Sequence, residues 1–205
     1  MNSTRSPLPS QPGSSQLSFD DGLDVEQRLA RWHTRGHDIR SRSGEPGIAR
    51  IEDIAHLRGL EIYEAMMRGD LPPPPIFESA DFMLVEAEAG RVVFQGEPLP
   101  RHYNPLGTIH GGWISTLLDS ALALSIQTLL PAGKVQTTAE LKINFVRALT
   151  ERVPLVRAEG RAIHVGGRMA TSDARLYGPD GKLYAHGSTT CFVYDWTEAM
   201  GKSKP

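Results

Sequence analysis

The chain has 205 residues, of which 40% are hydrophobic, and it carries a formal net charge of -2 at pH 7. This length and composition suffice for one sizeable core, which favours a single domain with an appendage over two complete domains. The small net charge gives no global reason to expect nucleic acid or an anionic membrane surface as a partner. Polar residues interrupt every long apolar run, and the single cysteine, Cys191, cannot form an internal disulfide. We therefore expect a cytoplasmic protein that does not enter a membrane.

The first third of the chain changes in composition twice. Residues 1–24 are rich in Ser, Pro, Gln and Gly, and we predict a disordered or irregular segment over residues 1–47. Its arginines between Arg28 and Arg42 are interpreted as a solvated face. Apolar residues recur at helical spacing over residues 48–67, and four prolines follow at 72–75. This pattern predicts an amphipathic helix and a stiff polyproline-like spacer, together covering residues 48–75.

The remaining chain alternates between strand and helix patterns. FMLVEAEAGRVVFQG, at residues 82–96, contains two apolar runs separated by Ala89-Gly90, which is typical of a hairpin. A long apolar helix is predicted over residues 111–130, and four strand-like stretches separated by turn residues follow it. Strands on both sides of one apolar helix predict an α+β domain over residues 76–195, in which an antiparallel sheet wraps that helix. Residues 196–205 are then a C-terminal tail.

One carboxylate stands inside the predicted apolar helix. Asp119 has no Lys or Arg to pair with between Gly111 and Leu130. Burying an unpaired carboxylate costs several kcal/mol, so Leu or Ala would be easier to accommodate at this position. We interpret Asp119 as a functional residue, and the alternative is a core Asp whose oxygens are satisfied by Ser115, Ser120 or the backbone.

Several motifs together resemble one known family. NPLGTIHGG (104–112) precedes the helix, Leu118-Asp119 lies within it, and TTAELKINFVRAL and AHGSTTCFV follow. These motifs are similar to those of the hotdog-fold acyl-CoA thioesterases of the PaaI-like, phenylacetate-degradation type, over residues 73–194. The resemblance implies a hotdog fold, an acyl-CoA substrate, and a homodimer or homotetramer. In such a dimer the two long helices lie antiparallel, and the active sites lie between subunits.

The start of the long helix suits a thioester carbonyl. A helix N-terminus carries unpaired N–H groups and a partial positive charge, and glycine lets a ligand approach closely. The Gly111 and Gly112 amides are therefore a candidate oxyanion hole. The alternative is that His110-Gly111-Gly112 is only a tight entry into the helix.

Helix geometry separates the two candidate groups. Gly111 and Asp119 are eight residues apart, which is about 12 Å along a helix that rises about 1.5 Å per residue. A base must come within about 3 Å of the group on which it acts, or reach it through one water. If both residues serve one thioester, Asp119 must come from a second copy with an antiparallel helix, as the resemblance implies.

The resemblance also implies roles for polar residues around the helix. Asn104 positions the attacking water or the substrate carbonyl, and His110 orients the loop and contacts the carbonyl. Thr138 holds the water or Asp119, although its neighbour Thr137 is equally placed in the sequence.

The phosphates of coenzyme A require a cationic surface. Arg147, and Arg168 beside Gly167, are candidates because guanidinium groups match phosphate geometry. An exposed arginine at a strand end is the alternative for each.

Other classes of protein fit this sequence less well. An α/β-hydrolase needs a Gly-x-Ser-x-Gly elbow, which is absent. His33 and His37 have helical spacing but no third ligand, so we expect no metal and no other cofactor. The preferred hypothesis is an acyl-CoA thioesterase. A non-catalytic acyl-CoA-binding hotdog module, or a hotdog hydratase or dehydratase, is the alternative, and the acyl group is left open.

Overall fold

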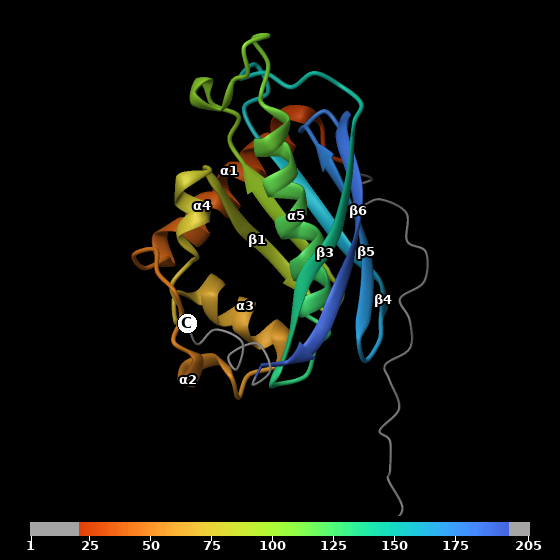
Figure 1. Cartoon of the computed structure of the whole chain (residues 1–205). Helices are drawn as coiled ribbons and strands as arrows, with labels where there is room; N and C mark the ends of the chain where they lie inside the picture. The colour runs from red at the N-terminus through yellow and green to blue at the C-terminus, as the bar shows by residue number, and fades with distance from the viewer. Residues whose placement is uncertain (1–20, 197–205) are drawn as a thin grey trace, which may run out of the picture.

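A six-stranded antiparallel sheet wraps around one long helix in the computed structural model, which describes residues 21–196 (Figure 1). The strand order is β1-β2-β4-β5-β6-β3, and α5 (Gly111–Gln127) lies against the inner face of the sheet. The strands are β1 (Phe82–Glu88), β2 (Arg91–Gly96), β3 (Lys134–Phe145), β4 (Val156–Val165), β5 (Met169–Tyr177) and β6 (Leu183–Asp195). The predicted α+β class, the β1–β2 hairpin and the sheet-wrapped helix are confirmed.

The helix α5 is held by an almost completely apolar surface. Its fully buried side chains include Leu117, Leu118, Leu122 and Ile126. Burial of a leucine-sized side chain contributes about 2 kcal/mol, so this surface is the main reason why α5 stays against the sheet. The contact is closest at Gly160 in β4, where an added Cβ would overlap the backbone carbonyl oxygen of Ala121.

The N-terminal part of the chain is helical, which corrects two predictions. Residues 25–42 form α1 (Val25–Arg42), so the prediction of an irregular segment over 1–47 is wrong there. Asp24 and Gln27 form a capping box, and Trp32 and Ile39 on one face of α1 are buried. The prediction relied on polar composition. The helix forms because Trp32 and Ile39, seven residues apart, lie on the same helical face and are buried together. The prediction for residues 1–20 lies outside the described residues.

The predicted single helix over 48–67 is instead two helices. They are α2 (Ile51–Ile54) and α3 (Gly59–Arg68), and a third short helix, α4 (Pro75–Ser79), begins at the last of the four prolines. The break has a tertiary cause, because the Gly59 amide donates to the Leu130 carbonyl at 3.0 Å and an added Cβ on Gly59 would overlap the Gln127 carbonyl. The start of α3 is thereby fixed against the end of α5.

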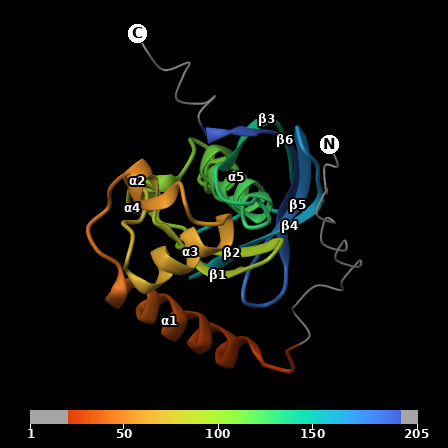
Figure 2. The same cartoon turned by 90° about the horizontal axis from the view of Figure 1, so that it is seen from below.

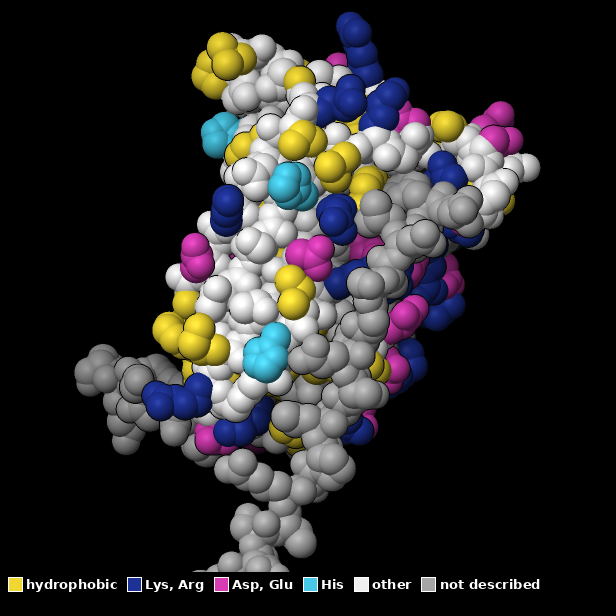
Figure 3. Space-filling view, turned by 90° about the vertical axis from the view of Figure 1, so that its right-hand side faces the viewer, with side chains coloured by type: hydrophobic (Ala, Val, Ile, Leu, Met, Phe, Trp, Pro, Cys, Tyr) yellow, Lys and Arg dark blue, Asp and Glu magenta, His cyan; other side chains and the backbone are white. Residues whose placement is uncertain are grey.

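The two faces of the sheet differ in what covers them. Figure 2 shows α5 on one side of the β1–β2 hairpin and α1 on the other. On the face shown in Figure 3, hydrophobic side chains stand among Lys, Arg, Asp, Glu and His side chains. Met169 and Phe192 pair across β5 and β6 and are each about half exposed.

The edge strand β3 leaves apolar side chains in contact with solvent. Its register with β6 places Leu141 and Phe145 on the inner face, and they are 37% and 54% exposed. The predicted half-buried strand is therefore less buried than expected within one chain. An exposed strand edge with apolar side chains is a typical surface for pairing with another chain.

We predict that Gly160→Ala destabilises the fold by about 3 kcal/mol, because the new methyl group would separate β4 from α5. Chemical denaturation of the purified chain measures this change. Gly44→Ala is the matched control, since no described atom lies within 4 Å of its added Cβ. We expect the control to change stability by less than about 0.5 kcal/mol. Equal stability of both variants would show that β4 and α5 can separate enough to accommodate the methyl group without loss of folding free energy.

Candidate active site

Asn104 shapes the loop that leads into α5. Its Oδ1 accepts hydrogen bonds from the amides of Leu106 and Thr108, at 2.9 and 3.3 Å, and its Nδ2 donates to Thr108 Oγ1 at 2.9 Å. The backbone amide of Asn104 also donates to the Thr108 carbonyl at 2.8 Å. The Asn104 carboxamide oxygen is thus engaged by its own loop, and the side chain fixes the position of the next residues.

His110 caps the helix and forms a hydrogen bond with one of the two glycine amides that follow it. Its Nδ1 accepts from the Gly112 amide at 2.8 Å, so the neutral ring carries its proton on Nε2. No described residue accepts a hydrogen bond from the Gly111 amide. Of the two amides predicted to form an oxyanion hole, Gly111 is therefore the available donor, whereas Gly112 is paired with His110.

The Gly111 amide lies at a cavity of about 390 Å³. Asn104, Gly111, Phe145 and Arg147 are among its lining residues. An added Cβ on Gly111 would come within 3.0 Å of the Phe145 ring, so a residue without a side chain fits best here. The structure thus brings three predicted residues, Asn104, Gly111 and Arg147, to one cavity.

Asp119 and Thr138 form a second cluster, which does not line that cavity. Thr138 Oγ1 donates to Asp119 Oδ1 at 3.0 Å. Thr138 lies on the inner face of β3, whereas its neighbour Thr137 is exposed, so Thr138 is the threonine that holds Asp119. Asp119 is only half-buried within this chain. The premise of a fully buried, unpaired carboxylate is therefore wrong.

The alternative partners of Asp119 also differ from expectation. Ser120 Oγ donates to the Thr116 carbonyl at 2.9 Å, and a hydroxyl from β3 contacts the carboxylate. The hydrogen bond to Asp119 therefore comes from Thr138 on β3, the residue that the resemblance implied, and not from Ser120 on the same helix.

The turn between β4 and β5 lies apart from this arrangement. Gly167 and Arg168 are exposed in that turn and are not among the residues that line the cavity. Arg147 is also exposed, but it follows directly after β3 at the cavity. Within one chain, Arg147 is therefore the predicted arginine that accompanies Gly111.

His102 supports the entry into α5, which the sequence analysis did not predict. Its carbonyl accepts from the His110 amide at 2.7 Å, and its ring stacks on Trp113 with a centroid distance of 4.9 Å. Its Nε2 lies 2.8 Å from Asp81 Oδ2. A hydrogen bond from Arg101 holds the pKa of Asp81 below its usual range, and the His102 bond acts in the same direction. No spacing signal links residues 81 and 102, since only the fold brings them together.

Residues 21–196 contain no group of three or more His, Cys, Asp or Glu side chains that could hold a metal ion. Across the same residues, every helix is too short or too polar to span a bilayer.

Residues 106–185 match the family model described as "Thioesterase superfamily". A curated protein of Archaeoglobus fulgidus, which is named provisionally as an esterase, is 28% identical over 117 residues, covering 57% of this chain and 73% of its own length.

Solved structures show the same fold. A variant of the phenylacetic acid degradation protein PaaI from Thermus thermophilus is 28% identical, with a TM-score of 0.52 over 58% of this chain and 97% of its own. The protein smu.793 from Streptococcus mutans, solved with acetyl CoA bound, is 25% identical, with a TM-score of 0.51 over 56% of this chain and 90% of its own. The predicted hotdog fold and the resemblance to its thioesterases are confirmed.

We predict that Asn104→Ala opens the loop before α5. Loss of the Oδ1 acceptor should raise hydrogen-exchange rates at the amides of Leu106 and Thr108 by about fivefold or more, equivalent to ~1 kcal/mol for a hydrogen bond. Asn104→Asp is the control, because its carboxylate keeps an acceptor for both amides and should preserve their protection. Unchanged exchange in Asn104→Ala would contradict this role.

Proposed function

We propose that this chain, which belongs to the thioesterase superfamily, hydrolyses acyl-CoA thioesters to a free acid and coenzyme A. One observation carries the proposal: α5 presents an available amide at its N-terminus and a carboxylate two turns later on the same helix. The amide can donate a hydrogen bond to a thioester carbonyl, and the carboxylate can activate a water or attack the acyl carbon. A PaaI-like subfamily assignment is part of the proposal.

The Gly111 amide supplies the oxyanion contact in this mechanism. It combines an available N–H with the positive end of the α5 dipole, and both stabilise charge that develops on a carbonyl oxygen. The cavity volume of about 390 Å³ lies within the range of small-molecule sites. Acetyl CoA in the Streptococcus mutans structure supports a coenzyme A ester as the ligand. Arg147 at the cavity is the first candidate for its phosphates, with Arg168 and Gly167 contributing from another copy.

Asp119 completes the site from a second subunit. Because about 12 Å of helix separates Gly111 from Asp119, one chain cannot place both on the same thioester. Among the described strands, β3 forms one edge of the sheet, and Leu141 and Phe145 are exposed beside that edge. This edge supports a homodimer in which two sheets join. The exposed outer-face residues Met169 and Phe192 support a further pairing into a homotetramer.

The chemistry follows from these placements. Asp119, oriented by Thr138, takes a proton from water as the water attacks the acyl carbon, or attacks that carbon itself to form an anhydride that water then cleaves. The Gly111 amide holds the carbonyl oxygen while it carries negative charge. The carbon–sulfur bond breaks, and coenzyme A leaves as the thiol after it gains a proton.

We predict that Asp119→Asn lowers kcat for acyl-CoA hydrolysis by about 10²-fold or more, because the amide cannot act as a base or nucleophile. A panel of short, medium and aromatic acyl-CoA thioesters, assayed for thiol release in the presence of a chelator, measures the activity. Asp70→Asn is the control, since Asp70 is an exposed partner of Arg68 and should retain full activity.

The same panel distinguishes the alternatives. Near-native turnover by Asp119→Asn would exclude a catalytic role for this carboxylate. Binding of acyl-CoA without thiol release by the unmodified chain would favour a non-catalytic binding module. Addition or loss of water at the acyl chain would favour a hydratase or dehydratase.

We predict that mixed dimers recover activity. Asp119→Ala and Asn104→Ala chains each impair both sites of their own dimer, but a mixed dimer has one site with an intact loop and an intact carboxylate. Random exchange should therefore give about a quarter of the unmodified rate, since half of the dimers are mixed and half of their sites are intact. Absence of recovery after exchange is verified by mass spectrometry would contradict a shared site.

A further inference from the structure

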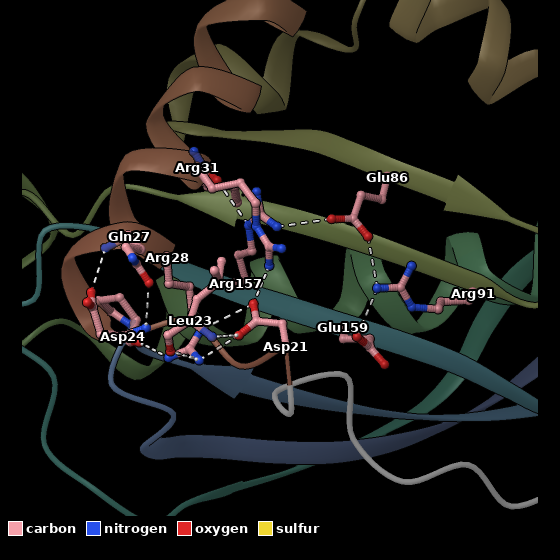
Figure 4. A network of polar contacts seen from close by, with 12 residues as sticks. Asp21, Leu23, Asp24, Gln27, Arg28, Arg31, Glu86, Arg91, Arg157 and Glu159 are labelled. Atoms are coloured by element: carbon pink, nitrogen blue, oxygen red, sulfur yellow. Dashed lines mark hydrogen bonds and ion pairs between the residues drawn. The ribbon is translucent and has the colours of Figure 1, made fainter.

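Two polar networks join the N-terminal part of the chain to the rest of the domain. Figure 4 shows the first, beneath α1, where Glu86 accepts hydrogen bonds from Arg157 at 3.0 Å and from Arg91 at 2.9 Å. Arg28 is buried in this network, so the interpretation of the α1 arginines as a solvated face is wrong at that position. We interpret these contacts as the fastening of α1 to the sheet. The second network leads from the start of β1 to the start of α5.

Asp81 connects α4 to β1 in a strained backbone conformation. Its φ is +52°, a left-handed value that only glycines share among the described residues. The Asp81 amide donates to the Glu78 carbonyl at 3.2 Å, and the Asp81 carbonyl accepts from the Glu97 amide at 3.1 Å. Strained backbone persists where surrounding contacts hold it, and it is common at functional sites. Here it sets the direction of the Asp81 carboxylate, which contacts His102.

The Asp81 carboxylate fixes the His102 ring. The Leu99 amide donates to His102 Nδ1 at 3.2 Å, so the neutral ring carries its proton on Nε2. That Nε2 donates to Asp81 Oδ2 at 2.8 Å, and Arg101 Nε donates to the same oxygen at 2.7 Å. The His102 side chain is only 8% exposed. Because both ring nitrogens are engaged within the chain, His102 is suited to hold a position and not to transfer a proton.

Contacts of His102 hold the residues on both sides of Gly111. The His102 carbonyl accepts from the amide of His110, the residue directly before Gly111, at 2.7 Å. The His102 ring stacks on Trp113 with a centroid distance of 4.9 Å and an interplanar angle of 21°. The Trp113 indole also donates to the Ala80 carbonyl at 2.6 Å. The first turn of α5 is therefore held from the segment between α4 and β1 through separate contacts before and after Gly111.

We propose that Asp81 and His102 are positioning residues for the Gly111 amide, an inference that rests on the proposed oxyanion role of that amide. Neither residue lines the cavity at Gly111, so both act through His110 and the first turn of α5. A donor stabilises a developing oxyanion only when its direction is preset, and a displacement of about 1 Å can lower a rate by about 10²-fold. If Asp81 only closed the turn before β1, its loss would change stability and not the rate at saturating substrate.

Two substitutions at Asp81 separate the carboxylate from the backbone. Asp81→Gly removes the acceptor for His102 and relieves the left-handed backbone, whereas Asp81→Asn keeps an acceptor oxygen and tolerates this conformation. With the acyl-CoA thioester that the unmodified chain hydrolyses fastest, we expect Asp81→Gly to lower kcat by about 10-fold or more and to leave KM within about twofold. Asp81→Asn should keep kcat within about threefold of the unmodified value. Asp70→Gly is the matched control, because Asp70 is an exposed partner of Arg68 outside this network and should leave kcat unchanged.

The amide resonance of Gly111 gives a second measurement, which needs no substrate. Movement of the first turn of α5 should change the proton and nitrogen chemical shifts of this amide. We expect the change in Asp81→Gly, and shifts near the unmodified values in Asp81→Asn and Asp70→Gly. His102→Phe keeps an aromatic ring beside Trp113 but loses both ring hydrogen bonds. It should reproduce the loss of kcat, and it keeps the test decisive if Asp81→Gly does not fold.

Three kinetic results would each overturn the proposal. They are a kcat near the unmodified value in both Asp81→Gly and His102→Phe, an equal loss of kcat in Asp70→Gly, and a rise in KM with kcat unchanged. If the unmodified chain hydrolyses no thioester, the proposed function fails by itself, and the Gly111 chemical shifts then decide the positioning role. Unchanged shifts in Asp81→Gly would overturn that role, whereas changed shifts that Asp81→Asn restores would support it.

Discussion

The close packing of α5 against the sheet is the constraint on which the other features of the domain depend. Gly160 lets β4 approach the helix backbone near Ala121, and the buried side chains of α5 fill the concave face of the strands. This contact fixes the rotation of the helix about its axis. It therefore decides that Asp119 points toward Thr138 on β3, while the helix start opens into the cavity beside Phe145.

A rigid helix also acts as a spacer between two chemical groups. The Gly111 amide and the Asp119 carboxylate cannot approach each other, because a helix does not shorten without losing its hydrogen bonds. In an isolated chain, this distance prevents the Gly111 amide and the Asp119 carboxylate from contacting the same substrate group. In an antiparallel pair of helices, the same separation would bring each carboxylate to the partner's amide, and the exposed β3 edge offers a surface for such pairing.

Charge is used differently on the two faces of the sheet. On the inner face, the Asp119 carboxylate accepts a hydrogen bond from the Thr138 hydroxyl and is partly exposed to solvent. On the outer face, the Arg157 guanidinium lies over the Trp32 ring of α1, and Arg157 and Glu159 alternate with core residues of β4. Desolvation makes each of these outer charges more dependent on its neighbours than a solvated charge is.

The sequence by itself determined the class of the domain, the hairpin at Ala89-Gly90 and the helix that begins at Gly111. These features follow from local periodicity and turn residues, which act over a few residues. Only the tertiary structure decided that α1 forms, that α2 and α3 separate at Gly59, and that Gly112 is paired with His110. It also decided that Asp81 supports His102 and that Arg157 lies buried beneath α1. Each of these depends on contacts between residues that are distant in the chain, or on side-chain directions that composition and spacing do not specify.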